Sequence, residues 1–85
     1  MKKRILIVEN DTYTQNSLRD VINQQFPEID TTKIASSIKE ALEIIPDYDP
    51  SLLILNTHLP DGTAFDLLRK IEMFDFKVVF LTGNK

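Results

Sequence analysis

The chain contains no cysteine, a single histidine and only two glycines among its 85 residues. The absence of cysteine excludes disulfide bonds, thiolate metal sites and thiol nucleophiles, and it is compatible with a reducing compartment. We therefore expect a cytoplasmic location. Because Gly62 and Gly83 are the only glycines, no glycine-rich phosphate loop follows the first apolar segment, which argues against a nucleotide or flavin site.

Long apolar runs and excess positive charge are also missing. The longest runs, Ile5–Val8, Leu52–Leu55 and Val78–Leu81, have four residues each. A helix that crosses a bilayer needs about 20, so we expect no membrane interaction. The chain has 10 basic and 13 acidic side chains, and the basic ones are scattered except for residues 2–4. Nucleic-acid binding by this segment therefore has little support.

The composition is that of one small globular unit, with 42% apolar and 27% charged residues. A chain of this length hides only a modest share of its surface when it folds, so we expect marginal stability without help from a partner or from further sequence. We treat residues 1–85 as a single, partial domain.

Short apolar runs alternate with longer segments of helical spacing, a pattern typical of βαβ units around a parallel sheet. The runs predict four strands, at Arg4–Val8, Asp30–Ala35, Ser51–Leu55 and Lys77–Thr82. The first, third and fourth are continuously apolar, which favours strands that are buried on both faces. The second is more polar, and we expect it at the edge of the sheet.

Three helices are predicted between the strands, at about Tyr13–Gln25, Ile38–Ile45 and Ala64–Phe74. The pairs Thr12/Gln15 and Ser37/Glu40 have capping-box spacing at the first two starts, and the Pro60-Asp61-Gly62 turn precedes the third. Pro27 helps to end the first helix, and Pro46 and Pro50 mark the exit of the second. The side chains expected to face the sheet are Leu18, Val21, Ile22 and Phe26, then Ile38, Ala41, Leu42 and Ile45, and finally Phe65, Leu67, Leu68 and Ile71.

Polar residues follow three of the predicted strands where each strand ends. They are Glu9, Asn10 and Asp11 after the first, Asn56, Thr57 and His58 after the third, and Thr82 after the fourth. Each group alone is explained by turns and helix caps. Because the carboxyl ends of parallel strands meet at one edge of a sheet, the three groups together favour a ligand site there.

These segments resemble the receiver domains of two-component response regulators. Arg4-Ile-Leu-Ile-Val-Glu-Asn-Asp11 is similar to the family's first strand and acidic cluster, and Val78-Val-Phe-Leu-Thr82 to its fourth strand and hydroxyl residue. The most specific match is Leu52-Leu-Ile-Leu-Asn-Thr-His-Leu-Pro-Asp-Gly62, which is similar to the third strand and phosphorylation loop. The resemblance implies an α/β, flavodoxin-like open parallel sheet with strand order 2-1-3-4, and with the last helix-strand-helix portion missing.

The resemblance also implies a function in phosphorelay signal transduction, as a signalling module and not an enzyme. In the family, a carboxylate at the position of Asn56 accepts a phosphoryl group from a sensor histidine kinase or phosphotransfer protein, and Thr82 would hydrogen-bond that group. Mg²⁺ would be held at the positions of Glu9, Asn10 and Asn56 and by the backbone carbonyl of His58.

Two amides depart from the family's pattern. Asn56 is a poor nucleophile and a neutral ligand, and Asn10 removes a second charge from a site where Mg²⁺ prefers anionic oxygens. We therefore expect no phosphoryl acceptance and weak or absent Mg²⁺ binding. Asn56 is either an engineered change or the mark of a natural pseudo-receiver, and the alternative function is a structural or self-associating fragment without a phosphate switch.

The remaining unusual residues have plain structural interpretations. His58 has no second histidine or cysteine with which to bind metal, so we expect a solvent-facing loop residue. Asp61-Gly62 is a turn and not a calcium loop, and Phe74 and Phe76 are expected to pack in the core. If the sheet ends with the fourth strand, Val78–Leu81 is an exposed edge, which predicts homo-oligomers through edge pairing or exchange of elements.

Overall fold

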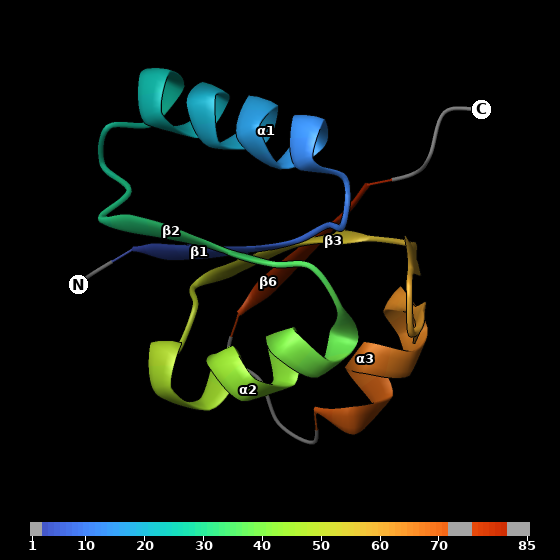
Figure 1. Ribbon diagram of the computed structural model, residues 1–85. Helices are drawn as coiled ribbons and strands as arrows, with labels where there is room; N and C mark the ends of the chain where they lie inside the picture. The colour runs from blue at the N-terminus through green and yellow to red at the C-terminus, as the bar shows by residue number, and fades with distance from the viewer. Residues whose placement is uncertain (1–2, 72–75, 82–85) are drawn as a thin grey trace.

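The computed structural model describes residues 3–71 and 76–81, which form an α/β fold around one parallel sheet (Figure 1). The sheet consists of β1 (Arg4–Val8), β2 (Thr31–Ala35), β3 (Leu52–Asn56) and β6 (Lys77–Leu81), hydrogen-bonded in the order β2-β1-β3-β6. This is the parallel 2-1-3-4 order that the resemblance to receiver domains implied. The fold class is therefore confirmed.

The helices cover both faces of the sheet (Figure 1). One face carries α1 (Thr12–Gln25), and the other carries α2 (Ile38–Tyr48) and α3 (Ala64–Lys70). A short antiparallel hairpin of β4 (His58–Leu59) and β5 (Gly62–Thr63) connects β3 to α3. Within the described residues, no helix has the length and apolar character needed to cross a membrane.

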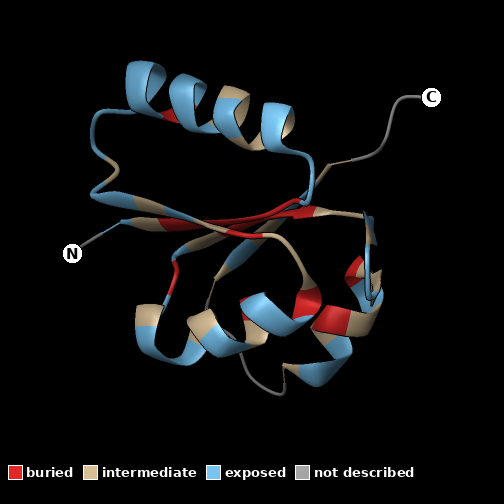
Figure 2. Cartoon of the chain, viewed as in Figure 1, coloured by how far each residue is buried: buried red, intermediate tan, exposed pale blue. Residues whose placement is uncertain are grey.

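The two central strands are buried on both faces, as their unbroken apolar runs predicted. Successive side chains of a strand point to opposite faces, so β1 and β3 supply two separate clusters. The cluster on the α2 and α3 side contains Leu6, Val8, Leu53 and Leu55, and the cluster on the α1 side contains Ile5, Ile7, Ile22 and Ile54. Figure 2 shows this burial concentrated along the centre of the sheet.

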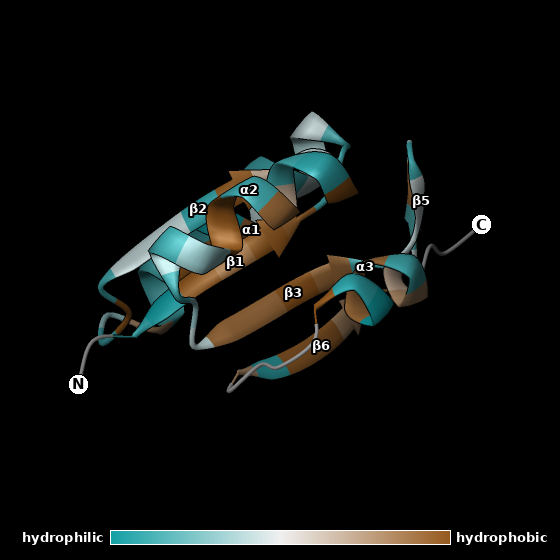
Figure 3. Ribbon diagram, turned by 90° about the horizontal axis from the view of Figure 1, so that it is seen from below, coloured by the Kyte–Doolittle hydropathy of each residue, from teal (hydrophilic) through white to brown (hydrophobic). Residues whose placement is uncertain are grey.

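The two outer strands differ in character, as the hydropathy colouring of Figure 3 shows. β2 is mostly polar and lies at one edge, as predicted. β6, whose apolar run favoured burial on both faces, instead forms the other edge of the described sheet, with Val79 48% and Phe80 42% exposed. Its start at Lys77 agrees with the prediction, and Thr82 lies outside the described residues. β3 begins one residue later than predicted and includes Asn56.

The start of α1 corrects the predicted capping box. Asp11, and not Thr12, is the N-cap, because its extended backbone places its carboxylate to accept from the Thr14 N–H at 2.9 Å. Val21 and Phe26, expected to face the sheet, are 51% and 49% exposed. Val21 lies about 100° around the helix from the buried Ile22. Phe26 is the C-cap, with a non-helical φ of -132°, and has left the helical stripe.

The end of α2 is a second correction. The helix was expected to end at Ile45, but it continues through Pro46 to Tyr48. Proline in the last turn removes only the hydrogen bond that its own N–H would have donated, and the Tyr48 hydroxyl anchors this turn to β1 by donating to the Ile5 carbonyl at 3.2 Å. The N-terminus agrees with prediction, since Ser37 accepts from the Glu40 N–H at 3.1 Å.

The described part of α3 is shorter than predicted and rotated relative to the expected stripe. It ends at Lys70, where Ile71 becomes extended, and the predicted end at Phe74 lies outside the described residues. Phe65 is 59% exposed instead of facing the sheet, while Leu67 is fully buried. A Thr63/Asp66 capping box sets the start of the helix and hence the face that it buries. Phe76 packs partly buried against the core, as expected.

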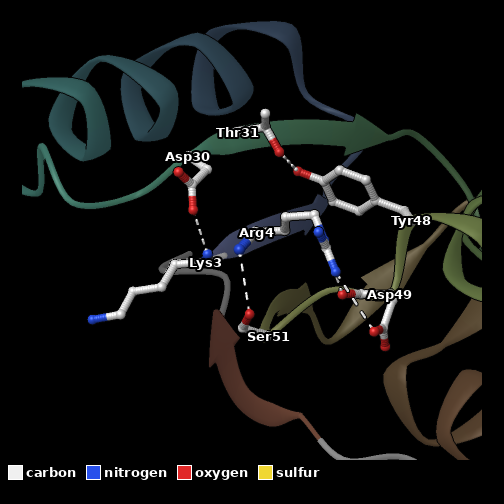
Figure 4. Close-up of polar contacts among 7 residues, drawn as sticks. All are labelled: Lys3, Arg4, Asp30, Thr31, Tyr48, Asp49 and Ser51. Atoms are coloured by element: carbon white, nitrogen blue, oxygen red, sulfur yellow. Dashed lines mark hydrogen bonds and ion pairs between the residues drawn. The ribbon is translucent and has the colours of Figure 1, made fainter. Parts of the chain in front are cut away.

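Charged and polar groups tie together the amino ends of the strands (Figure 4). Arg4 donates from its backbone N–H to the Ser51 hydroxyl at 3.3 Å and from Nε to the Asp49 carbonyl at 3.2 Å. Its guanidinium also pairs with the Asp49 carboxylate at 3.6 Å. Beside it, the Lys3 N–H donates to the Asp30 carboxylate at 2.6 Å. These contacts join β1 to the segments that lead into β2 and β3.

Candidate functional site

The carboxyl ends of β1 and β3 lie side by side, because the two strands pair in parallel with Val8 opposite Leu55. The next residue of each strand is therefore also close, and these residues are Glu9 and Asn56. Glu9 continues the sheet by one residue, since its N–H donates to the Ala35 carbonyl of β2 at 2.9 Å. Thr82, expected at the same edge, lies outside the described residues.

Glu9 is the buried acidic residue of this edge, with 4% of its surface exposed. One carboxylate oxygen accepts from the Asn56 side-chain nitrogen at 2.9 Å, and the other accepts from the Asp11 backbone N–H at 2.9 Å. A buried charge is costly unless it is hydrogen-bonded. Here both oxygens have a donor, and both donors are neutral groups.

Asn56 uses both ends of its carboxamide. Its Nδ2 donates to Glu9, and its Oδ1 accepts from the His58 backbone N–H at 3.1 Å. The reverse orientation would place an oxygen against a carboxylate and an NH₂ group against an N–H, so the two partners independently require the same orientation. Asn56 therefore bridges the end of β1 and the start of the hairpin.

Asn10 and Asp11 lie outside this bridge. Both are exposed. The Asp11 carboxylate accepts from the Thr14 backbone N–H and from the Thr14 hydroxyl, at 2.9 and 2.7 Å, which caps α1. A cap of this kind places a negative charge at the positive end of the helix dipole. The side chain of Asp11 is therefore directed to the helix, while only its backbone N–H contacts Glu9.

His58 is exposed and opens the hairpin, as expected for a solvent-facing residue. Its Nδ1 lies 3.2 Å from the hydroxyl of Thr57. The backbone N–H of His58 donates to the side-chain oxygen of Asn56. The neighbouring Thr57 is held in place through its backbone, which donates to Leu81 of β6 and accepts from Ala64 of α3, at 3.2 and 3.1 Å.

Two further residues organise the edge, and sequence reasoning assigned them other roles. The Gln15 side-chain nitrogen donates to the backbone carbonyl of Glu9 and to the Ser36 hydroxyl, so it connects α1 to β1 and to the loop after β2. The sequence shows only a glutamine three residues after Thr12. That spacing is typical of a capping box, and it does not indicate a contact with β1 or with the loop after β2. The partners of Gln15 are instead the Glu9 carbonyl and the Ser36 hydroxyl, and Ser36 lies 21 residues away in the chain.

Asp61 is the second of these residues. Its carboxylate accepts from the backbone N–H groups of Ile38 and Lys39, at 2.9 and 3.1 Å, and so caps α2 from the hairpin. The hydrogen bond from the Ile38 N–H is the main cause that holds the pKa of Asp61 below its ordinary value. In the same way, the Thr63 backbone N–H lowers the pKa of Asp66 at the start of α3.

The donor set at this edge is poorer in anionic oxygens than Mg²⁺ prefers. Mg²⁺ takes oxygen ligands and is bound through carboxylates, but Asn56 presents its nitrogen to Glu9, and both Glu9 oxygens already accept hydrogen bonds. Asn10 contributes no charge. In residues 3–71 and 76–81, no three histidine, aspartate or glutamate side chains are grouped so that they could hold a metal ion.

The comparison with known families decides what kind of domain this is. The model of the response regulator receiver domain matches residues 5–85. The chain belongs to the response regulator receiver family. It is therefore a receiver domain of two-component signalling, a kind of domain that is typically a signalling module and not a catalyst.

Individual relatives agree with this membership. The receiver domain is 35% identical over 81 residues to the transcriptional regulatory protein CitB of Klebsiella pneumoniae, covering 93% of this chain and 34% of that protein. It is 28% identical over 75 residues to the chemotaxis protein CheY of Halobacterium salinarum, covering 88% of this chain and 60% of the relative. The chain thus spans about a third to three fifths of the length of these relatives.

Solved receiver structures share the fold. The MaeR response regulator bound to beryllium trifluoride superposes with a TM-score of 0.88 and 25% identity, over 98% of this chain and 69% of that one. The non-phosphorylated HemR receiver domain of Leptospira biflexa superposes with a TM-score of 0.79 and 32% identity, over 98% and 66% of the two chains. Membership of the family implies a histidine kinase partner, and receivers typically bind Mg²⁺.

Proposed function

We propose that this receiver domain takes part in two-component signalling without accepting a phosphoryl group. The observation that carries the proposal is the state of Asn56, which stands at the acceptor position by resemblance and directs its nitrogen to Glu9 at 2.9 Å. Phosphoryl acceptance needs a carboxylate oxygen as nucleophile. The amide supplies none, because its only oxygen carries no full charge and accepts from the His58 N–H.

Weak or absent Mg²⁺ binding belongs to the same proposal. Of the ligand positions implied by resemblance, Glu9 alone is anionic, Asn10 and Asn56 are neutral, and His58 would contribute only its backbone carbonyl. Phosphoryl transfer develops negative charge on the transferred group, which needs a cation or donors for its stabilisation. Thr82 would supply one such hydrogen bond, and that role remains a prediction.

The direct test compares the chain with its Asn56→Asp variant. Both are incubated with a small-molecule phosphodonor and Mg²⁺, and their masses are measured. We expect the mass of one added phosphoryl group on the variant and none on the unchanged chain. A phosphoryl adduct on the unchanged chain would contradict the proposal.

Binding of beryllium trifluoride distinguishes the effect of Asn56 from the effect of Asn10. MaeR has been solved with this compound bound. If Asn56 alone silences the domain, Asn56→Asp binds it, and the unchanged chain does not. If binding appears only in the double variant Asn10→Asp/Asn56→Asp, both amides contribute to the loss of binding.

The proposed partner is a sensor histidine kinase or a phosphotransfer protein, which the domain would contact without receiving a phosphoryl group. Such a domain would compete with phosphorylatable receivers for the same kinase. The test adds the unchanged chain to a kinase and a phosphorylatable receiver, and the expected result is slower labelling of that receiver. The cytoplasmic location expected from the sequence remains a prediction.

The second candidate function is self-association through the β6 edge. The favouring observation is the exposure of Val79 and Phe80, 48% and 42%, on the edge strand of the described sheet. The Phe80 ring contacts the exposed ring of Phe65, with centroids 5.8 Å apart, so α3 extends the apolar surface on the face of the sheet that carries Phe80, while Val79 points to the opposite face. Unpaired apolar edges promote pairing with another chain, and a charged residue on the edge discourages it.

Sedimentation at increasing concentration tests this second function. We expect the unchanged chain to dimerise and Val79→Lys to remain monomeric. Val21→Lys is the matched control, because Val21 is similarly exposed but lies on α1, and this variant should still dimerise. A monomer at every concentration for the unchanged chain would eliminate the self-association hypothesis.

A further inference from the structure

We propose that the Asn56 carboxamide is a permanent clamp, which holds the carboxyl ends of β1 and β3 together without any cation. The inference rests on the proposed function, because it concerns the same site in a receiver that does not switch. It goes further by giving Asn56 a positive structural role. On this view the amide is not merely an inactive acceptor.

The geometry of the amide is that of a two-sided bridge. One side donates to Glu9 at 2.9 Å and the other accepts from the His58 N–H at 3.1 Å. An amide is suited to this place because it carries a donor and an acceptor on one planar group. A carboxylate at position 56 could still accept from His58, but it could not donate to Glu9.

The clamp matters for stability because its acceptor, Glu9, is a buried carboxylate. Glu9 is 4% exposed, and its partners are the Asn56 amide and the Asp11 backbone N–H. An aspartate at position 56 would place a second carboxylate within hydrogen-bond distance of this buried one. Like charges at that separation repel strongly in a poorly solvated place, and a bound cation relieves such repulsion. The neutral amide avoids this repulsion, so the ends of β1 and β3 stay together without a cation.

The contacts of the clamp extend beyond the two strand ends. His58, which Asn56 holds, begins the hairpin whose Asp61 caps α2. Glu9, on the other side, accepts through its backbone carbonyl from Gln15 of α1. The amide therefore lies between elements on both faces of the sheet, and it keeps them in one arrangement.

Thermal unfolding with and without Mg²⁺ tests the clamp. Each variant is melted in chelator and in millimolar Mg²⁺. We expect the unchanged chain to have the same Tm in both conditions. We expect Asn56→Asp to lose about 5 °C in chelator, because a change of 1 kcal/mol shifts Tm by several degrees in a domain of this size, and to recover in Mg²⁺.

Two companion variants identify the cause of that loss. Asn56→Ala removes the bridge without adding charge, so its Tm should fall in both conditions and Mg²⁺ should not restore it. Asn16→Asp makes the same amide-to-acid change on the exposed face of α1, and its Tm should be unaffected by Mg²⁺. A rise in the Tm of the unchanged chain on adding Mg²⁺ would overturn the proposal, as would an Asn56→Ala variant as stable as the unchanged chain.

A measurement on the unchanged chain covers the case in which the variants fail to fold. The side-chain NH₂ signals of Asn56 in a nitrogen-15 spectrum should exchange slowly with solvent and should not move on adding Mg²⁺. Fast exchange, or a shift with Mg²⁺, would contradict the clamp. The proposed function would be contradicted by a different result, a phosphoryl adduct on the unchanged chain. The proposed function and the clamp can therefore fail separately.

Discussion

The two ends of the central strands are tied together by opposite means. At the amino ends, Arg4 reaches the exposed Asp49, whose side chain is 80% accessible to solvent, in an ion pair of 3.6 Å. At the carboxyl ends, the buried Glu9 accepts from the neutral amide of Asn56 at 2.9 Å. One end pairs two full charges, with the Asp49 carboxylate well solvated and the Arg4 side chain 28% accessible, and the other uses a single charge that is almost fully buried.

From this difference we expect burial, more than formal charge, to set how much each contact contributes to stability. An ion pair in solvent contributes little, because water and salt screen it and two long side chains must be held still. A buried carboxylate with two donors is different, since removing either group leaves a polar atom without a partner. We therefore expect the carboxyl ends, where the neutral bridge lies, to be the more sensitive to mutation.

Replacing Glu9 by alanine should have the largest effect. The change leaves the Asn56 NH₂ group and the Asp11 N–H without their acceptor, and we expect a loss of about 3 kcal/mol in the free energy of unfolding. Urea titration measures it. Glu43→Ala is the control, because Glu43 is exposed on α2 and its removal should change stability by less than about 0.5 kcal/mol. Equal effects of the two changes would refute the importance of burial.

Replacing Gly62 by alanine should come next, because it strains the hairpin next to the bridge. Gly62 has φ of +148°, which other residues rarely adopt, and a Cβ there would lie 2.8 Å from the Asp66 carboxylate and from Ile38. The side chains can move, but the backbone strain remains, so we expect a loss of about 2 kcal/mol. Urea titration checks it, and stability equal to that of the unchanged chain would show that the hairpin relaxes freely.

Much of this arrangement could be predicted from the sequence. The unbroken apolar runs Ile5–Val8 and Leu52–Leu55 predicted two strands buried on both faces, because such a strand has no wet side that would require alternation. The parallel order then predicted that residues after β1 and β3 meet at one edge. The structure brings Glu9 and Asn56 together across 47 residues of chain, in agreement with that argument.

The errors have a common physical cause, since each concerns a choice between local partners that tertiary contacts decide. Asp11 and Thr12 are both good caps, and the backbone at the end of β1 selects Asp11. A proline commonly ends a helix, but α2 continues past Pro46 to Tyr48, whose hydroxyl contacts the Ile5 carbonyl of β1. Asp61 lies in the predicted turn, but its capping of α2, through partners 22 and 23 residues away, was not predicted. Local patterns do not encode such contacts.

The cap supplied by Asp61 gives a smaller and pH-dependent effect. The folded state lowers the pKa of Asp61 from its ordinary value of 3.8, so the charged carboxylate stabilises the fold above that pH. The contribution is lost as pH falls through the lowered pKa. We expect Asp61→Asn to unfold at a lower Tm than the unchanged chain at neutral pH, and the two melting curves to converge in acid. A gap that persists in acid would mean that the carboxylate charge is not the cause.

Replacing Arg4 by methionine should have the smallest effect, although it removes a full charge. Methionine retains an apolar stem, and the Asp49 carboxylate and carbonyl that lose the guanidinium remain open to water, so we expect a loss of about 0.5 kcal/mol at low salt. High salt should reduce the difference from the unchanged chain, because it screens the pair that the variant lacks. Urea titrations at both salt concentrations measure this. A loss as large as that of Glu9→Ala would show that the amino ends are tied as firmly as the carboxyl ends, and the comparison between buried and exposed ties would then fail.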